Sequence, residues 1–328
     1  MSGRPRRGLV LGGGGVLGAA WTVGALRALE REYDLDARDF DEYVGTSAGS
    51  ILVALLGAGV SVDDLLRHQR DEPLGPGPLE GFFFDYGDAT GGSRPGRPKH
   101  GIGSKALLSQ GVRYLRALPP TVVVSALLPE GRGRLDGIGA LVGHCVPHGW
   151  VDRDGVAVVA MDYDTGRRVT FGREGAPEAD LCRAVMASCA IPGWYEPIRI
   201  GDRRYIDGGA WSSTSVDLMA GRGLDELFVL APSVSFDLDS PHRFATKMER
   251  RWRNHVTGRC LREVAGVHAE GTQVTVLGPG RRDLEAMGAN LMDVARRSAV
   301  IETSIVTSAE ALHDPAPLPA AAPFEEES

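Results

Sequence analysis

Two stretches decide the fold: "GLVLGGGGVLGAAWTVGALRALERE" at residues 8–32 and "EYVGTSAGSILVALLGAG" at residues 42–59. Each begins with a short apolar run, turns through glycines and continues with apolar residues at helical spacing. Two strand–turn–helix units within sixty residues predict a parallel sheet covered by helices. We therefore expect an α/β fold with a mostly parallel central sheet and helices on both faces, a three-layer sandwich.

Later segments extend this pattern. Residues 156–172 predict two strands joined by a turn at 164–166, residues 195–211 a hairpin, and residues 224–232 one more buried strand. We expect a helix after Ser61 and Asp64, which are spaced as a capping box, a helix from Pro177, and a long helix over 281–305. Residues 121–128 could be either strand or helix.

The predicted domain spans residues 1–312 as one unit. Residues 71–150 begin rich in proline and glycine and continue with helical patterns, which predicts a helical and loop insertion over the core. Its aromatic residues at 82–84 make it a candidate lid. Residues 313–328 have the composition of a disordered acidic tail.

The composition of the chain limits the classes of function that it can have. A net charge of -7 argues against nucleic-acid binding, which needs a dense basic surface. The four cysteines lack metal-site spacing and predict neither a disulfide framework nor a metal site. No apolar run approaches the ~18 residues of a membrane span. We expect a cytoplasmic protein that can also contact membrane surfaces.

Ser47 stands between Gly45 and Gly49 in a G-x-S-x-G pattern, where a strand gives way to a helix. Small neighbours allow the sharp turn of a nucleophile elbow, and the following helix N-terminus favours a developing oxyanion. The alternative is a serine that caps a buried helix. The pattern alone does not decide between them.

The glycine cluster ahead of the first helix has two interpretations. Gly13, Gly14 and Gly15 could present backbone donors to an oxyanion. Gly13, Gly15 and Gly18 also fit a dinucleotide fingerprint, with Glu30, Glu32 and Asp34 as nearby acids, but these acids do not end a second strand. Nucleotide binding is therefore the less favoured interpretation, but it stays open.

These motifs together resemble those of the patatin-like phospholipases. "GGGGVLG" resembles the family's glycine-rich oxyanion loop, "GTSAG" its serine elbow, "DGG" at 207–209 its aspartate motif, and "MASCAIP" at 186–192 the segment ahead of that aspartate. The resemblance covers about residues 8–232. The family pattern often has arginine where this chain has Leu17, which removes a cation near the loop.

The resemblance implies a serine acyl hydrolase of lipid esters with a Ser-Asp dyad and no cofactor or metal. Ser47 would be the nucleophile, Asp207 the general base, and Gly13, Gly14 and Gly15 the oxyanion hole. Two alternatives stay open: a lipid-binding pseudoenzyme, and an esterase with a Ser-Asp-His triad using His242, His255 or His268. Head group, acyl preference and oligomeric state are not predicted.

Overall fold

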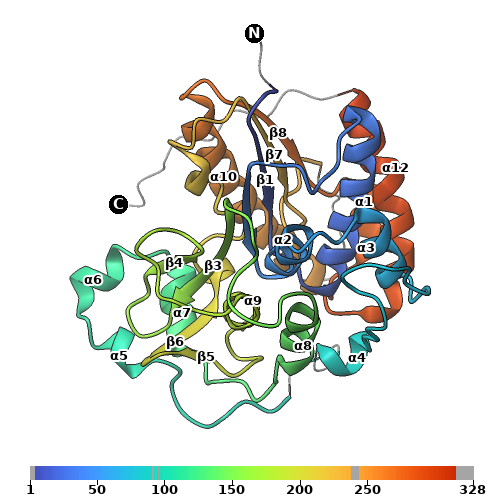
Figure 1. The fold of residues 1–328 in the computed structure, drawn as a ribbon. Helices are drawn as coiled ribbons and strands as arrows, with labels where there is room; N and C mark the ends of the chain where they lie inside the picture. Colours follow the sequence, from blue (N-terminus) through green and yellow to red (C-terminus); the bar gives the residue numbers. More distant parts are fainter. Residues whose placement is uncertain (1–3, 91, 93, 95, 238–243, 315–328) are drawn as a thin grey trace.

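The computed structural model describes residues 4–90, 92, 94, 96–237 and 244–314 (Figure 1). These residues form one eight-stranded sheet with helices on both faces. The strands are β1 (Arg7–Leu11), β2 (Glu42–Thr46), β3 (Val156–Asp162), β4 (Arg168–Phe171), β5 (Ile198–Ile200), β6 (Arg203–Asp207), β7 (Glu226–Leu230) and β8 (Gln273–Leu277).

The predicted parallel sheet is confirmed. β1 pairs in parallel with β2 and β7, β2 with β3, and β7 with β8. The pairs β3–β4, β3–β6 and β5–β6 are antiparallel, so both predicted hairpins form. Since β1 carries the glycine loop and β2 carries Ser47, their parallel pairing brings both to the same edge of the sheet.

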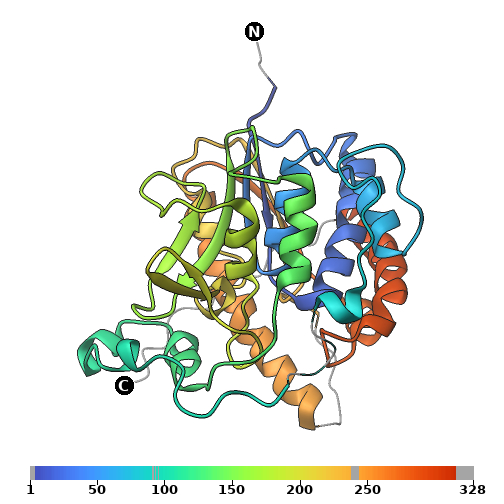
Figure 2. The same cartoon turned by 60° about the horizontal axis from the view of Figure 1, so that its bottom comes forward.

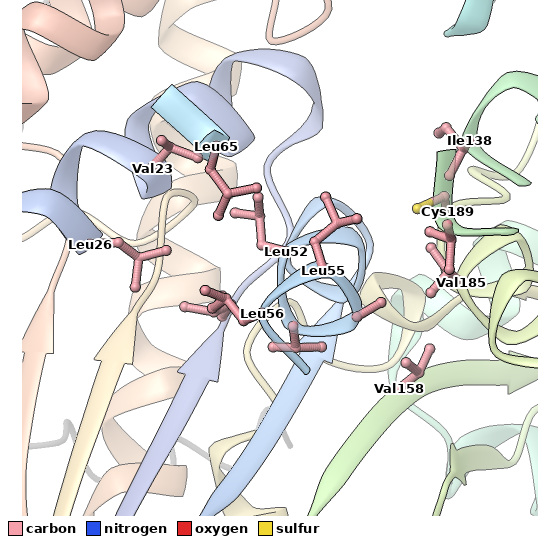
Figure 3. Close-up of a cluster of buried hydrophobic side chains, with 14 of the residues drawn as sticks. Val23, Leu26, Leu52, Leu55, Leu56, Leu65, Ile138, Val158, Val185 and Cys189 are labelled. Atoms are coloured by element: carbon pink, nitrogen blue, oxygen red, sulfur yellow. The ribbon is translucent and has the colours of Figure 1, made fainter. Parts of the chain in front are cut away.

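Helices cover both faces of the sheet because the central strands are buried on both sides. In β1, Leu9 and Leu11 belong to one core cluster, and Val10 belongs to the other. The first cluster includes α1 (Gly15–Tyr33), α2 (Ala48–Gly57), α3 (Val62–Gln69), α8 (Asp136–Cys145), α9 (Leu181–Ser188) and α12 (Arg297–His313); Figure 3 shows part of it around α2. The second includes α10 (Phe244–His268).

Residues 71–150 form short helices that run along one end of the core. In Figures 1 and 2 they pass from α4, below α1 and α12, to α5 and α6 at the opposite side. The segment 120–127 is helical and not a strand. Besides α8, the insertion contains α4 (Tyr86–Ala89), α5 (Lys105–Leu108), α6 (Val112–Arg116) and α7 (Pro120–Leu127).

Two helix predictions need correction, and two elements were not predicted. The long helix predicted over 281–305 is wrong: α11 (Arg281–Met287) ends at Gly288, whose φ of 67° is left-handed, and α12 begins only at Arg297. The helix expected from Pro177 begins at Leu181. Helix α10 and strand β8 were not predicted. The tail predicted at 313–328 lies, from residue 315 on, outside the described residues.

Within the described part of the chain, no helix combines the length and the apolar character needed to cross a bilayer.

Candidate functional site

Ser47 lies in a strained turn between β2 and α2. Its φ of 52° and ψ of -123° are rare for a residue with a side chain, which is the backbone expected of a nucleophile elbow. Only glycine fits at the two flanking positions, because neighbouring backbone atoms lie too close for a Cβ atom. A Cβ on Gly49 would lie 1.9 Å from the Leu11 carbonyl oxygen, and one on Gly45 would lie 2.6 Å from the Ser50 Cα.

Two serines hold this turn in place. The Ser47 N–H donates to the Ser188 hydroxyl at 2.8 Å, and that hydroxyl donates to the Val159 carbonyl of β3 at 2.6 Å. The Ser50 hydroxyl donates to the Ser47 carbonyl at 2.6 Å. Ser188 belongs to the 186–192 motif, to which the sequence analysis gave no structural role; here it ties the elbow to the sheet.

The sheet register explains how Asp207 reaches Ser47 across 160 residues. β4 runs along one edge of β3 at Val158–Met161. β2 pairs with residues 156–159 of β3 and β6 with residues 160–162, and since each of these parts overlaps the part paired with β4, both strands must lie on the other edge of β3. Thr46 at the end of β2 lies opposite Val159, and Asp207 at the end of β6 lies opposite Ala160. The C-terminal ends of β2 and β6 therefore meet beside β3. Ser47, which directly follows β2, comes to lie next to Asp207 at the end of β6.

The Asp207 carboxylate is buried, with 5% of the residue exposed. It accepts a hydrogen bond from the Gly209 N–H at 2.7 Å, and the nearby Ser47 hydroxyl also favours its charged form. Burial raises the pKa of this carboxyl to about 6, because desolvation outweighs these two interactions. At neutral pH Asp207 is thus an ionised and basic carboxylate near a hydroxyl.

The glycine loop lies directly beside Ser47, since a Cβ on Gly13 would be 3.1 Å from the Ser47 Cβ. The Gly13 N–H, however, donates to the Ser213 carbonyl at 2.8 Å, so this predicted oxyanion donor is already engaged. In the described chain the N–H groups of Gly14 and Gly15 have no protein acceptor. We therefore correct the candidate oxyanion donors to Gly14 and Gly15 at the start of α1.

The segment after β7 supports the loop from behind. The Ser233 hydroxyl donates to the Gly13 carbonyl at 2.5 Å, and Pro232 packs so closely on Gly14 that a Cβ there would lie 2.8 Å from it. The buried Arg253 of α10 donates to the Pro232 carbonyl at 2.7 Å. A guanidinium therefore lies behind the loop although Leu17, at the position where the family often has arginine, is a buried core residue.

Ser47 lies where two pockets meet. The inner pocket extends between α1, α2, α3 and α8 and is lined mainly by apolar side chains such as Ala19, Leu52, Leu65 and Ile138. The outer pocket contains the glycine loop and Asp207. Its rim carries exposed apolar residues: Val124 of α7, Leu128 directly after α7, and Trp252 of α10.

The described histidines do not form a triad with the pair. His68 is the only one of them that lines either pocket, and no histidine is among the groups that shift the pKa of Asp207. His255 and His268 lie on α10, where the ring of His268 contacts the Thr272 carbonyl. His242 lies outside the described residues. Across the described part of the chain, no three His, Cys, Asp or Glu residues are grouped to hold a metal ion.

The structure also weakens the dinucleotide interpretation. The parallel strand next to β1 ends on Thr46 and Ser47, where that fingerprint places an acid. Glu30 lies near the far end of α1, about 22 Å along the helix from the glycine loop at 1.5 Å per residue. Its carboxylate accepts the Ala37 N–H at 2.9 Å.

Comparison with known proteins gives a consistent family. A family model described as patatin-like phospholipase matches residues 9–220. An uncharacterized NTE family protein of Mycobacterium tuberculosis is 24% identical over 304 residues, which cover 91% of this chain and 42% of that protein. The chain thus spans less than half the length of this curated relative.

Two solved structures are similar to this chain at low sequence identity. VipD from Legionella pneumophila is 12% identical with a TM-score of 0.46, covering 95% of this chain and 67% of that one. The type III effector protein ExoU is 17% identical with a TM-score of 0.37, covering 95% of this chain and 54% of that one.

Proposed function

Because the chain belongs to the patatin-like phospholipase family, we propose that it is a lipid acyl hydrolase that cleaves carboxylic esters with a Ser47–Asp207 dyad. One observation carries this proposal: a serine in a strained elbow and a buried aspartate face the same pocket, close enough for the hydroxyl to lower the pKa of the carboxyl. The pair lies beside a pocket lined with apolar side chains, which suits an acyl chain.

In the proposed acylation step, Asp207 takes the hydroxyl proton of Ser47 while Oγ attacks the ester carbonyl carbon. The carbonyl oxygen becomes an oxyanion within reach of the Gly14 and Gly15 N–H groups and the N-terminus of α2. The intermediate then collapses, the bond to the alcohol breaks, and the leaving alkoxide receives the proton from Asp207. An acyl-Ser47 ester remains.

Deacylation repeats these steps with water. Asp207 removes a proton from a water molecule, the hydroxide attacks the acyl carbonyl, and Ser47 leaves with the proton that Asp207 returns. The products are a carboxylic acid and free enzyme. The chemistry of this scheme uses only groups of the chain and water.

The first test is labelling with a fluorophosphonate probe, followed by mass mapping of the modified residue. We expect modification at Ser47, none in Ser47→Ala, and faster labelling with detergent micelles if residues 71–150 act as a lid. A single-residue replacement of each candidate triad histidine should leave labelling unchanged. A folded protein that stays unlabelled in detergent would contradict hydrolysis and favour the lipid-binding alternative.

We propose that the outer rim contacts the lipid surface. Trp252 is 41% exposed and Val124 is 53% exposed, and both line the outer pocket that contains Asp207. Exposed apolar side chains around such an opening are typical of a surface that meets membrane lipids. A substrate could then enter without crossing water.

Replacing Trp252 by Ala should lower hydrolysis of phospholipid vesicles relative to a soluble short-chain ester by about fivefold or more, because the variant loses an interfacial aromatic anchor. The measurement is the ratio of the two rates. Val306→Ala, an equally exposed apolar position on α12, is the matched control and should keep the ratio. An unchanged ratio in Trp252→Ala would exclude the rim as the contact surface.

A further inference from the structure

Two polar side chains interrupt the otherwise apolar wall of the inner pocket. His68 and Gln69, at the end of α3, are 8% and 5% exposed and line the pocket that Ser47 opens into. The atoms His68 Nε2 and Gln69 Oε1 are both buried without a hydrogen-bond partner among the described residues. Each such atom is unfavourable in the folded protein unless something binds it.

The hydrogen bonds around His68 define what its free nitrogen offers. Its Nδ1 lies 2.7 Å from the Tyr86 hydroxyl, for which the described chain provides no other acceptor. We assign the hydroxyl as the donor to Nδ1, because the opposite tautomer would leave the hydroxyl proton without an acceptor; the proton of the neutral imidazole is then on Nε2. Burial, together with the nearby charge of Arg297, lowers the pKa of His68 to about 4, so the ring is neutral at physiological pH.

Arg297 fixes this arrangement from outside the pocket. Its guanidinium carbon lies 3.7 Å from the centre of the Tyr86 ring, and its Nε donates to the Gln69 carbonyl at 2.6 Å. The same guanidinium also pairs with Asp71. The Arg297 side chain thus anchors both the backbone of Gln69 and the ring of Tyr86, which binds His68. His68 Nε2 and Gln69 Oε1 are therefore held in place before a ligand binds.

One donor, His68 Nε2–H, and one acceptor, Gln69 Oε1, are the complement of a hydroxyl group, which accepts and donates at once. An unsubstituted alkyl chain would leave both atoms unpaired. A carboxylate would bring a charge against the Gln69 oxygen in an apolar pocket, which is unfavourable. A ketone would satisfy the donor alone.

We propose that the inner pocket binds an acyl chain that carries a hydroxyl group within the chain, so that the preferred substrates are esters of hydroxy fatty acids. The inference rests on the proposed hydrolase function and specifies its substrate class. His68 and Gln69 line the inner pocket but not the outer one that also contains Asp207. The hydroxyl therefore belongs inside the pocket, well beyond the ester, and not next to the carbonyl.

The test compares 4-nitrophenyl esters of octadecanoic, 12-hydroxyoctadecanoic and 3-hydroxyoctadecanoic acid in detergent. For the wild type we expect kcat/KM to be about tenfold higher for the 12-hydroxy ester than for the unsubstituted ester, the size of a specific buried hydrogen-bond effect. The 3-hydroxy ester should gain no such advantage. Gln69→Leu and His68→Phe should abolish the preference, which is the ratio of two kcat/KM values measured on the same variant and does not depend on its absolute rates.

Leu55→Met is the matched control, because it changes the same pocket without changing its polar groups. Its absolute rates can shift, but the preference should persist. Hydrolysis of both esters with no preference in the wild type, or with a preference that survives in both polar variants, would overturn the inference and leave the hydrolase proposal standing.

If the folded protein hydrolyses neither ester, the hydrolase proposal fails and binding decides the inference separately. The displacement of a fluorescent fatty acid by octadecanoic and 12-hydroxyoctadecanoic acid is then compared in wild type and Gln69→Leu. Tighter binding of the hydroxy acid that is lost in the variant would support the pocket assignment. Equal binding would reject it.

Discussion

Asp207→Asn should reduce kcat/KM for a lipid ester by at least about 10³-fold, because the amide cannot accept the proton of Ser47. In the wild type, kcat/KM should fall as the pH drops through about 6, where Asp207 becomes protonated. Asp217→Asn is the matched control, since that carboxylate is exposed on the rim of another pocket and bound to Arg168. It should keep the wild-type rate.

The same substitution should not destabilise the protein. A carboxyl whose pKa is raised from 3.8 to about 6 contributes stability below pH 4 that is lost as the pH rises through 6, about 3 kcal/mol in all. Asn carries no such charge. The free energy of unfolding of Asp207→Asn minus that of the wild type should therefore increase between pH 4 and pH 7.5, as measured by denaturant unfolding.

These two readouts together separate a lost base from a lost fold. A variant that is inactive and unfolds more easily at every pH would show only structural damage, and a variant within tenfold of the wild-type rate would place the base elsewhere. Burial that makes Asp207 basic also costs stability, which is a common property of catalytic sites.

The local patterns around the elbow predicted most of what positions Ser47. In residues 8–59, strand-like and helix-like patterns are separated by glycines. These patterns are local in sequence, so they predict β1, α1, β2 and α2. The position of Asp207 came only from a motif. Its approach to Ser47 depends on β2 and β6 sharing one edge of β3, a pairing between distant segments that no local pattern contains.

The oxyanion loop shows the same limit. Gly13, Gly14 and Gly15 are equivalent in sequence, but the carbonyl of Ser213, two hundred residues away, engages the N–H of Gly13 alone. Helix α10 could have been found, because Val256, Cys260, Val264 and Val267 follow helical spacing and form one apolar stripe within a charged segment. The end of α11 before Gly288 could also have been predicted, because glycine often follows the last residue of a helix.

Gly49→Ala should lower the free energy of unfolding by at least about 3 kcal/mol or prevent folding. Its Cβ would lie 1.9 Å from the Leu11 carbonyl oxygen and 2.4 Å from the Leu11 carbonyl carbon. Both atoms belong to backbone inside the sheet, so no side-chain rotation can relieve the clash. Either β1 or the start of α2 must move.

Gly266→Ala in α10 is the matched control, because the space around its Cβ is open to 4 Å and alanine favours helix by up to about 1 kcal/mol. Soluble yield and denaturant unfolding of the two variants give the comparison. A Gly49→Ala protein as stable as Gly266→Ala would mean that α2 does not approach β1 this closely. The close approach matters for function because it brings the N-terminus of α2, Ser47 and the glycine loop together at the pockets. Loss of the fold and loss of the site should therefore occur together.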